Sequence, residues 1–176
     1  LNRRQQLLEI ASQRDALVAA GISYWTWRGD MPAPDEMRDA TRRQLSVMAQ
    51  AGADVVFLEM MVDQANFEVT LDATKDIGLP VWAGLTTARN ADGEIRLRDG
   101  DPLAPAIEVA AHNHVDLINV MHTEVEYVSD SIDAIRFCKP SSLVKCFTSF
   151  CISREPYMLI VQFSSNNTYG SMSPRE

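Results

Sequence analysis

Four short apolar segments recur at similar intervals along the chain, and each is followed by a segment with helical spacing. They begin near residues 22, 54, 80 and 115. The segment over 54–59 is a continuous apolar run closed by Glu59, as expected for a parallel strand covered by helices. Regular alternation of strand and helix implies βαβ units that share one parallel sheet. The pattern over residues 1–136 therefore predicts an α/β fold.

The local signals predict where these elements begin and end. Apolar residues spaced near 3.6 predict a first helix over 2–20 with Gly21 as its stop, and aromatic and β-branched residues predict a strand over 22–27. Further strands are expected over 80–86 and 115–121, and the stretch 90–93 is expected to be a polar loop with a turn. Three aspartates are expected to cap helix N-termini: Asp35, Asp63 and Asp101.

Four such units admit two architectures. A closed (β/α)₈ barrel needs about 250 residues, so four units correspond to half of one. A half-barrel would leave unpaired edge strands, which invite pairing with another chain. An open doubly wound sheet is the alternative, because four strands form it without closure. The pattern alone does not favour either architecture.

The charge of the chain restricts its partners. The net charge is −8 and the sequence pI is about 4.8, whereas nucleic acids and anionic membranes reward a basic surface. A small-molecule ligand is therefore expected, with no nucleic-acid or membrane partner, and the oligomeric state stays open. No apolar run approaches the roughly 20 residues of a membrane helix, and residues 1–5 precede no apolar signal core. These features predict a cytoplasmic protein.

Composition changes abruptly after Arg136. Residues 1–136 hold 22 acidic and 12 basic side chains, whereas residues 137–176 hold 2 and 4, together with 8 of the 13 serines. We therefore expect two regions, 1–136 as the folded unit and 137–176 as a tail outside it. A shifted reading frame, an unspliced segment or an assembly error would explain the change. The tail carries all three cysteines, which we expect to be free: Cys138, Cys146 and Cys151.

Several segments of residues 1–136 resemble, in order, the homocysteine S-methyltransferase family. Residues 1–8 (LNRRQQLL) resemble the family's "lNrrav" helix, and 51–59 (AGADVVFLE) resemble its "AGxDxxxxET" segment at the fourth barrel strand. Residues 79–86 (LPVWAGLT) resemble its "lPvwvSft" strand, and the loop over 92–103 matches its "dG…l.dG.pl" connection. Residues 115–122 (VDLINVMH) stand where the family has a sixth strand ending "iGvNC". The resemblance implies strands three to six of a (β/α)₈ TIM barrel.

The resemblance also implies a chemistry. Its members, of the betaine–homocysteine methyltransferase and methionine synthase type, use zinc held by three cysteines to bind homocysteine as a thiolate, which attacks an activated methyl group to form methionine. Barrel active sites lie at the C-terminal ends of strands. There the sequence places Glu59, which matches the family's substrate-binding glutamate, and Thr86, a second substrate-binding candidate. The methyl donor stays open among betaines, sulfonium compounds and folate acting through cobalamin.

His122 replaces the first zinc cysteine of the family, and the "GGCCG" motif that carries the other two is absent from this sequence. A histidine nitrogen can bind zinc, so His122 is our metal-ligand candidate, with a substrate contact or a loop position without a role as alternatives. The charged residues Arg28 and Asp30 are expected at the surface. Three interpretations stay open: a homocysteine methyltransferase whose chain as given is incomplete and inactive, a diverged barrel enzyme for another small molecule, or a non-catalytic fragment.

Overall fold

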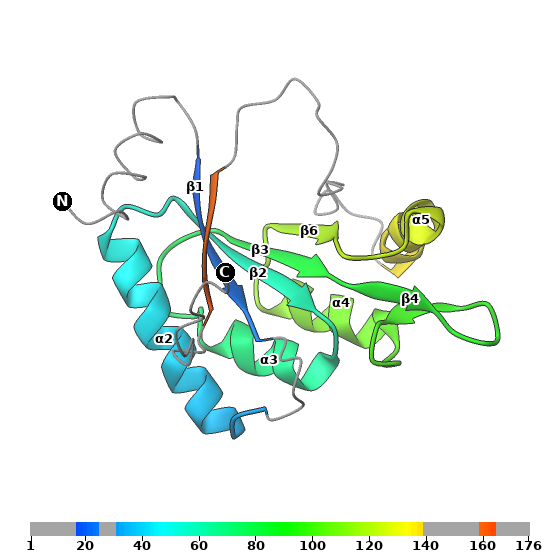
Figure 1. The fold of residues 1–176 in the computed structure, drawn as a ribbon, viewed down its shortest axis with the longest axis horizontal. Helices are drawn as coiled ribbons and strands as arrows, with labels where there is room; N and C mark the ends of the chain where they lie inside the picture. Colours follow the sequence, from blue (N-terminus) through cyan, green and yellow to red (C-terminus); the bar gives the residue numbers. More distant parts are fainter. Residues whose placement is uncertain (1–16, 25–30, 139–158, 165–176) are drawn as a thin grey trace, which may run out of the picture.

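The computed structural model describes residues 17–24, 31–138 and 159–164. Its centre is a five-stranded parallel sheet in the order β6-β3-β2-β1-β7 (Figure 1). The strands of this sheet are β1 (Val18–Ser23), β2 (Val55–Met61), β3 (Val81–Leu85), β6 (Leu117–Val120) and β7 (Leu159–Ser164). Strands β1, β2, β3 and β6 stand side by side in the order in which they occur along the chain, as in a barrel wall.

The described parts of the connections between these strands contain helices. The helices are α2 (Pro34–Gln50), α3 (Gln64–Asp72), α4 (Leu103–His112), the 3₁₀ turn η1 (Val125–Tyr127) and α5 (Val128–Cys138). Figure 1 shows α2, α3 and α4 along the same side of the sheet. One core cluster joins that sheet face to side chains from the four α-helices of the described residues, including Leu45 of α2, Phe67 of α3, Ile107 of α4 and Ile135 of α5. An open doubly wound sheet would carry helices on both faces, so this arrangement matches the predicted barrel segment.

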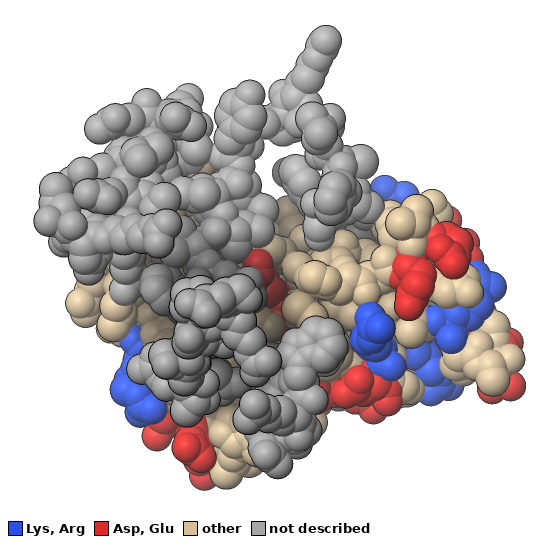
Figure 2. Space-filling model, viewed as in Figure 1, with Lys and Arg blue, Asp and Glu red and all other residues tan. Residues whose placement is uncertain are grey.

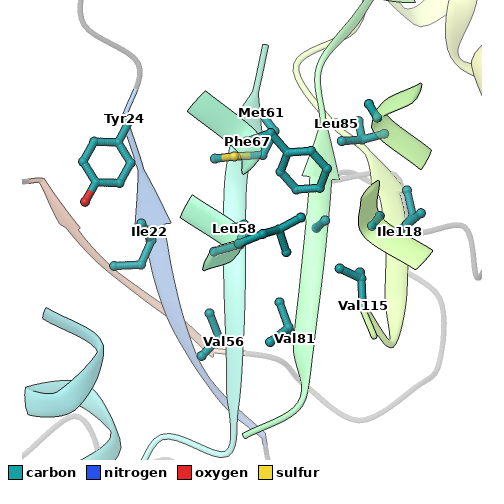
Figure 3. Close-up of a cluster of buried hydrophobic side chains, with 14 of the residues drawn as sticks. Ile22, Tyr24, Val56, Leu58, Met61, Phe67, Val81, Leu85, Val115 and Ile118 are labelled. Carbon is teal, nitrogen blue, oxygen red and sulfur yellow. The ribbon is translucent and has the colours of Figure 1, made fainter. Parts of the chain in front are cut away.

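The helix-facing core explains why these strands form. In β2, Val56 and Leu58 are fully buried and point toward the helices, and they pack with Val81 of β3 and Ile118 of β6 (Figure 3). Phe67 of α3 is 0% exposed and lies over β2 and β3. Burying a side chain of this size contributes roughly 1.5–3 kcal/mol, which holds α3 against the sheet.

The first strand lies four residues earlier than the sequence predicts. The expected helix over 2–20 is wrong at its end, because β1 runs from Val18 to Ser23 and Gly21 lies inside it. The expected strand over 22–27 is confirmed at Ile22 and Ser23, whereas Tyr24 lies outside β1. Gly21 is therefore a strand residue and not a helix stop, paired in register with Phe57. The short run Val18-Ala19-Ala20 fits a helix by spacing, but its side chains are buried on both faces of the sheet. Tertiary burial outweighs the local helix propensity here.

The capping predictions have mixed outcomes. Asp63 is confirmed as the N-cap of α3, since its Oδ1 accepts from Asn66 N at 2.8 Å. Asp35 is wrong as a cap, because Ala33 holds that position and Pro34 opens α2. Asp101 is also wrong as a cap: α4 starts after Pro102, and Asp101 Oδ2 instead accepts from Gln64 N at 2.8 Å. Asp101 therefore joins the start of α3 to the start of α4.

The loop after β3 contains a hairpin that the sequence prediction missed. The strands β4 (Thr87–Arg89) and β5 (Ile95–Leu97) pair antiparallel around the predicted turn at residues 90–93. Figure 2 shows basic and acidic side chains interspersed over this part of the molecule. Arg96 pairs with Glu94 at 2.8 Å, and Arg89 pairs with Asp130 of α5. The hairpin thus reaches across to α5.

Strand β7 lies in the region expected to be a separate tail, and it pairs in parallel register with β1. The predicted boundary at residue 136 stays a prediction. Residues 1–16 and 25–30, with Trp25, Trp27, Arg28 and Asp30, lie outside the described residues, as do Cys146 and Cys151. Within the described part of the chain, the helices lack the length and apolar character needed to cross a membrane.

Candidate active site

The second face of the sheet, which we call the inner face, points away from the helices. Strand alternation places Val55, Phe57 and Glu59 of β2 there, and a small cluster on this face joins Ala19, Val55, Phe57 and Met121, with Met60 and Trp82 packed against it. In a barrel this face lines the interior, and the C-terminal ends of its strands surround the active site. Glu59 is the carboxylate at that end of β2.

A β-bulge positions Glu59. Leu58 pairs with Ala83 and Met61 pairs with Leu85, so β2 uses one more residue than β3 across this interval. Met60 takes up the extra residue with a φ of 58°, in the left-handed region that non-glycine side chains rarely adopt. Its N–H points at Met121 Sδ, 3.2 Å away. Bulges of this kind re-aim neighbouring side chains and are frequent beside active sites.

Glu59 is a desolvated carboxyl group. Its side chain is 5% exposed, and burial raises its pKa to about 7 from an ordinary value of 4.5. Burial is the single cause resolved for this shift, so no cation among the described residues offsets the loss of hydration. A carboxyl group in this state gains most from a ligand that brings a positive charge.

Gly84 and Asn119 extend the site across the next two strands. Because Leu58 pairs with Ala83, the residues that follow them, Glu59 and Gly84, lie at one level of the sheet. Gly84 is in turn the register partner of Asn119 in β6. A Cβ on Gly84 would lie 2.9 Å from Asn119 Oδ1 and would overlap Met121 Sδ. The side chains of Asn119 and Met121 therefore occupy the space that a side chain on Gly84 would need.

Two buried oxygens near these strand ends have no hydrogen-bond partner among the described residues. They are Asn119 Oδ1, on a side chain 6% exposed, and Thr86 Oγ1, on a side chain 0% exposed. A buried acceptor without a partner costs about 1–3 kcal/mol, so such atoms usually mark a place where a ligand or water binds. The predicted substrate-binding residue Thr86 thus follows β3 directly, with an unused oxygen.

Hydrogen bonds hold the loop after β6 in place. Thr123 Oγ1 accepts from Thr87 N at 3.0 Å, and the Thr87 hydroxyl bonds to both Thr123 Oγ1 and Ser131 Oγ at 2.8 Å. Arg98 Nη1 donates to His122 O at 3.1 Å. His122 has a φ of 50° and an exposed side chain. The loop backbone is therefore fixed, while the imidazole faces solvent.

The described residues do not by themselves bring a set of zinc ligands together. Within the described ranges, no three histidine, cysteine, aspartate or glutamate side chains come close enough to share a metal ion. Cys138, the cysteine in the described part, ends α5 unpaired and half-buried. The predicted ligand role of His122 accordingly stays a prediction.

A cavity of about 230 Å³ opens beside the site, between the C-terminal ends of β1 and β2 and the start of α3. Tyr24, Met60, Asn66 and Asp99 line it, whereas Glu59 does not. Burial, together with the nearby carboxylates of Asp63 and Asp101, raises the pKa of Asp99. Tyr24 Oη bonds to Thr41 and donates to Met37 O at 2.9 Å, which fixes α2 against the end of β1.

Fold and site together define a segment of a (β/α)₈ barrel with a buried acid at the C-terminal end of a strand. The sequence model of the homocysteine S-methyltransferase family matches residues 6–161, which is most of the chain. The chain belongs to the homocysteine S-methyltransferase family. The match extends past residue 136 and into β7.

Individual relatives agree with this assignment. Homocysteine S-methyltransferase 3 of Arabidopsis thaliana is 27% identical over 140 residues, in an alignment that covers 72% of this chain and 39% of that protein. The apo homocysteine methyltransferase MmuM from Escherichia coli has a similar fold, with a TM-score of 0.61 and 17% identity over 75% of this chain and 49% of that one. Its metallated form gives the same TM-score at 16% identity, over 82% of this chain and 53% of that one.

A wider set of barrels shares the fold. The carboxyl transferase domain of Rhizobium etli pyruvate carboxylase has a TM-score of 0.56 at 15% identity, over 83% of this chain and 25% of that one. The chain thus spans about two fifths of its curated relative and half of the solved methyltransferases. Identities this low establish a common fold, and the activity has to be argued from the residues.

Proposed function

We propose that this chain provides the homocysteine-binding wall of an S-methyltransferase barrel. In the proposed reaction the homocysteine thiol loses its proton to solvent, and a bond forms between the resulting thiolate sulfur and a methyl carbon. The bond from that carbon to its donor breaks, its electron pair leaves with the donor, and the product is methionine. The observation that carries the proposal is Glu59, a carboxyl group 5% exposed at the C-terminal end of β2 with no offsetting cation among the described residues. The family assignment supplies the substrate.

The role of Glu59 in this proposal is to bind the substrate ammonium group. With a pKa of about 7, the empty site is half protonated at neutral pH. An ammonium ion favours the ionised form, so binding displaces the proton and pairs the two charges away from water. Fixing the amino end of homocysteine in this way orients its sulfur relative to the barrel axis. Thr86, with its unused buried oxygen, is the second proposed contact.

The test is calorimetric titration of the whole chain with homocysteine at pH 8 and pH 6. If the carboxylate alone binds the ammonium, a pKa of about 7 makes Kd about tenfold larger at pH 6. Glu59→Gln should weaken binding at pH 8 by roughly ten- to hundredfold, since it removes a charged hydrogen-bond partner. The exposed Glu126→Gln is the matched control and should bind like wild type. Equal affinity of wild type and Glu59→Gln would overturn the proposal.

A second candidate function is a diverged barrel enzyme that acts on another small molecule. The observation that favours it is His122, which stands in place of a zinc cysteine of the family and has an exposed side chain with no converging ligands in the described region. Zinc titration followed by dialysis and metal analysis separates the two candidates. Retention of one zinc per chain, lost in His122→Ala, favours the methyltransferase.

A further inference from the structure

Asn119 has no role in the interpretation above, yet its position in β6 is unusual. The strand residues on either side of it, Ile118 and Val120, are apolar and buried against the helices. Asn119 points to the opposite, inner face and is 6% exposed. A polar side chain there without a hydrogen-bond partner for its oxygen lowers stability, so its presence calls for another function.

The geometry shows where the Asn119 amide lies. Its Oδ1 occupies the space above Gly84, as the 2.9 Å separation from a Cβ built on Gly84 demonstrates. Gly84 belongs to β3, which lies between β6 and β2, and it stands at the same level of the sheet as Glu59 of β2. The acceptor of Asn119 and the carboxyl group of Glu59 therefore stand on the same face, at the same end of the sheet, with a residue lacking a side chain between them.

The chemistry of these atoms defines a ligand class. Glu59 offers a carboxylate, Asn119 an amide oxygen and Thr86 a hydroxyl oxygen, and the two neutral oxygens have no partner among the described residues. A primary ammonium ion has three N–H donors and a positive charge. Three acceptors, one of them charged, match such a group better than they match an anion or an apolar group.

We propose that Asn119 is a specificity-determining residue whose Oδ1 accepts a hydrogen bond from the ammonium group that Glu59 neutralises, so that the site selects ligands carrying a primary amine. This inference rests on the proposed function and adds the residue that distinguishes an amine-bearing thiol from the same thiol without its amine. Glu59 supplies charge, and Asn119 supplies direction, because an amide oxygen accepts along defined lone-pair directions.

The experiment compares Asn119→Leu with wild type, using homocysteine and 4-sulfanylbutanoate, which lacks the amine. At pH 8, Asn119→Leu should bind homocysteine roughly ten- to hundredfold more weakly, as expected for loss of a hydrogen bond to a charged donor. The Kd of 4-sulfanylbutanoate should not change. Asn119→Asp, which keeps the acceptor, should bind homocysteine at least as tightly as wild type.

A stability measurement separates recognition from a structural role. Because leucine has nearly the shape of asparagine and removes an unpaired buried acceptor, Asn119→Leu without ligand should unfold at the same urea concentration as wild type or a higher one. A lower midpoint, or equal weakening of both thiols, would show that Asn119 shapes the sheet and would overturn the inference. So would unchanged homocysteine binding in Asn119→Leu.

The outcomes also separate this inference from the proposed function. If wild type binds homocysteine and Glu59→Gln does not, while Asn119→Leu binds like wild type, the inference about Asn119 fails and the proposed function stands. If wild type binds neither homocysteine nor 4-sulfanylbutanoate, both fail together.

Discussion

The buried carboxyl group of Glu59 should make the stability of the fold depend on pH in a way that one substitution removes. Its pKa is raised from 4.5 in the unfolded chain to about 7 in the folded protein. Between these values the folded state binds more protons than the unfolded state, so stability falls as the pH rises through this window. Below pH 4.5 Glu59 is protonated in both states, so its ionisation does not destabilise the fold. Above pH 7 the destabilisation by ionised Glu59 is complete.

The magnitude follows from the shift. One pKa unit corresponds to about 1.4 kcal/mol, so ionised Glu59 destabilises the fold by roughly 3 kcal/mol at pH 8. Glu59→Gln keeps the size of the side chain and does not titrate. The difference in unfolding free energy between this variant and wild type should therefore grow by about 3 kcal/mol from pH 4.5 to pH 8, in favour of the variant.

Urea unfolding of both proteins, followed by circular dichroism at steps between pH 4.5 and pH 8, measures this difference. Other titrating groups are common to both proteins and cancel. The exposed Glu126→Gln is the control, and its difference from wild type should stay within about 0.5 kcal/mol over the same range. A flat difference for Glu59→Gln would refute the claim that Glu59 is desolvated.

Two other substitutions test the packing around the site. Gly84→Ala should destabilise the fold by about 1–3 kcal/mol, because the new Cβ displaces Met121 and Asn119. In urea unfolding, adding Met121→Ala to this variant should recover part of the lost stability. Additive losses from the two substitutions would contradict this steric account. Asp63→Ala should cost about 1 kcal/mol through loss of the α3 cap, whereas Asp63→Asn should stay near wild type, and equal losses for both would point to charge instead.

Much of the fold is predictable because its strands are continuous apolar runs with buried side chains. The run that ends at Glu59 was expected as a parallel strand and is β2, and Asp63 was expected as a cap and is one. The start of β1 was missed, since Val18 and Ala20 fit helical spacing equally well and only their partners in β2 decide between helix and strand. Such pairing is non-local and leaves no trace in the local pattern.

The candidate site is predictable where a single residue ends a strand and unpredictable where neighbours matter. Glu59 stands out in the sequence as a charge that closes an apolar run. Asn119 carries a weaker signal, one polar residue inside an apolar strand, and its importance depends on Gly84, which lies 35 positions earlier and is its register partner. The bulge at Met60 likewise depends on how β2 aligns with β3.

The sequential order of β1, β2, β3 and β6 has a consequence for how the chain acquires its structure. Each of these strands finds its partner in the preceding βα unit, so the loops to be closed are short and assembly can proceed unit by unit as the chain emerges from the ribosome. Strand β7 is the exception, because its partner β1 lies at the other end of the described chain. Among the described strand pairs, this one closes the longest loop, and we expect it to be the last step of folding and the first contact to open.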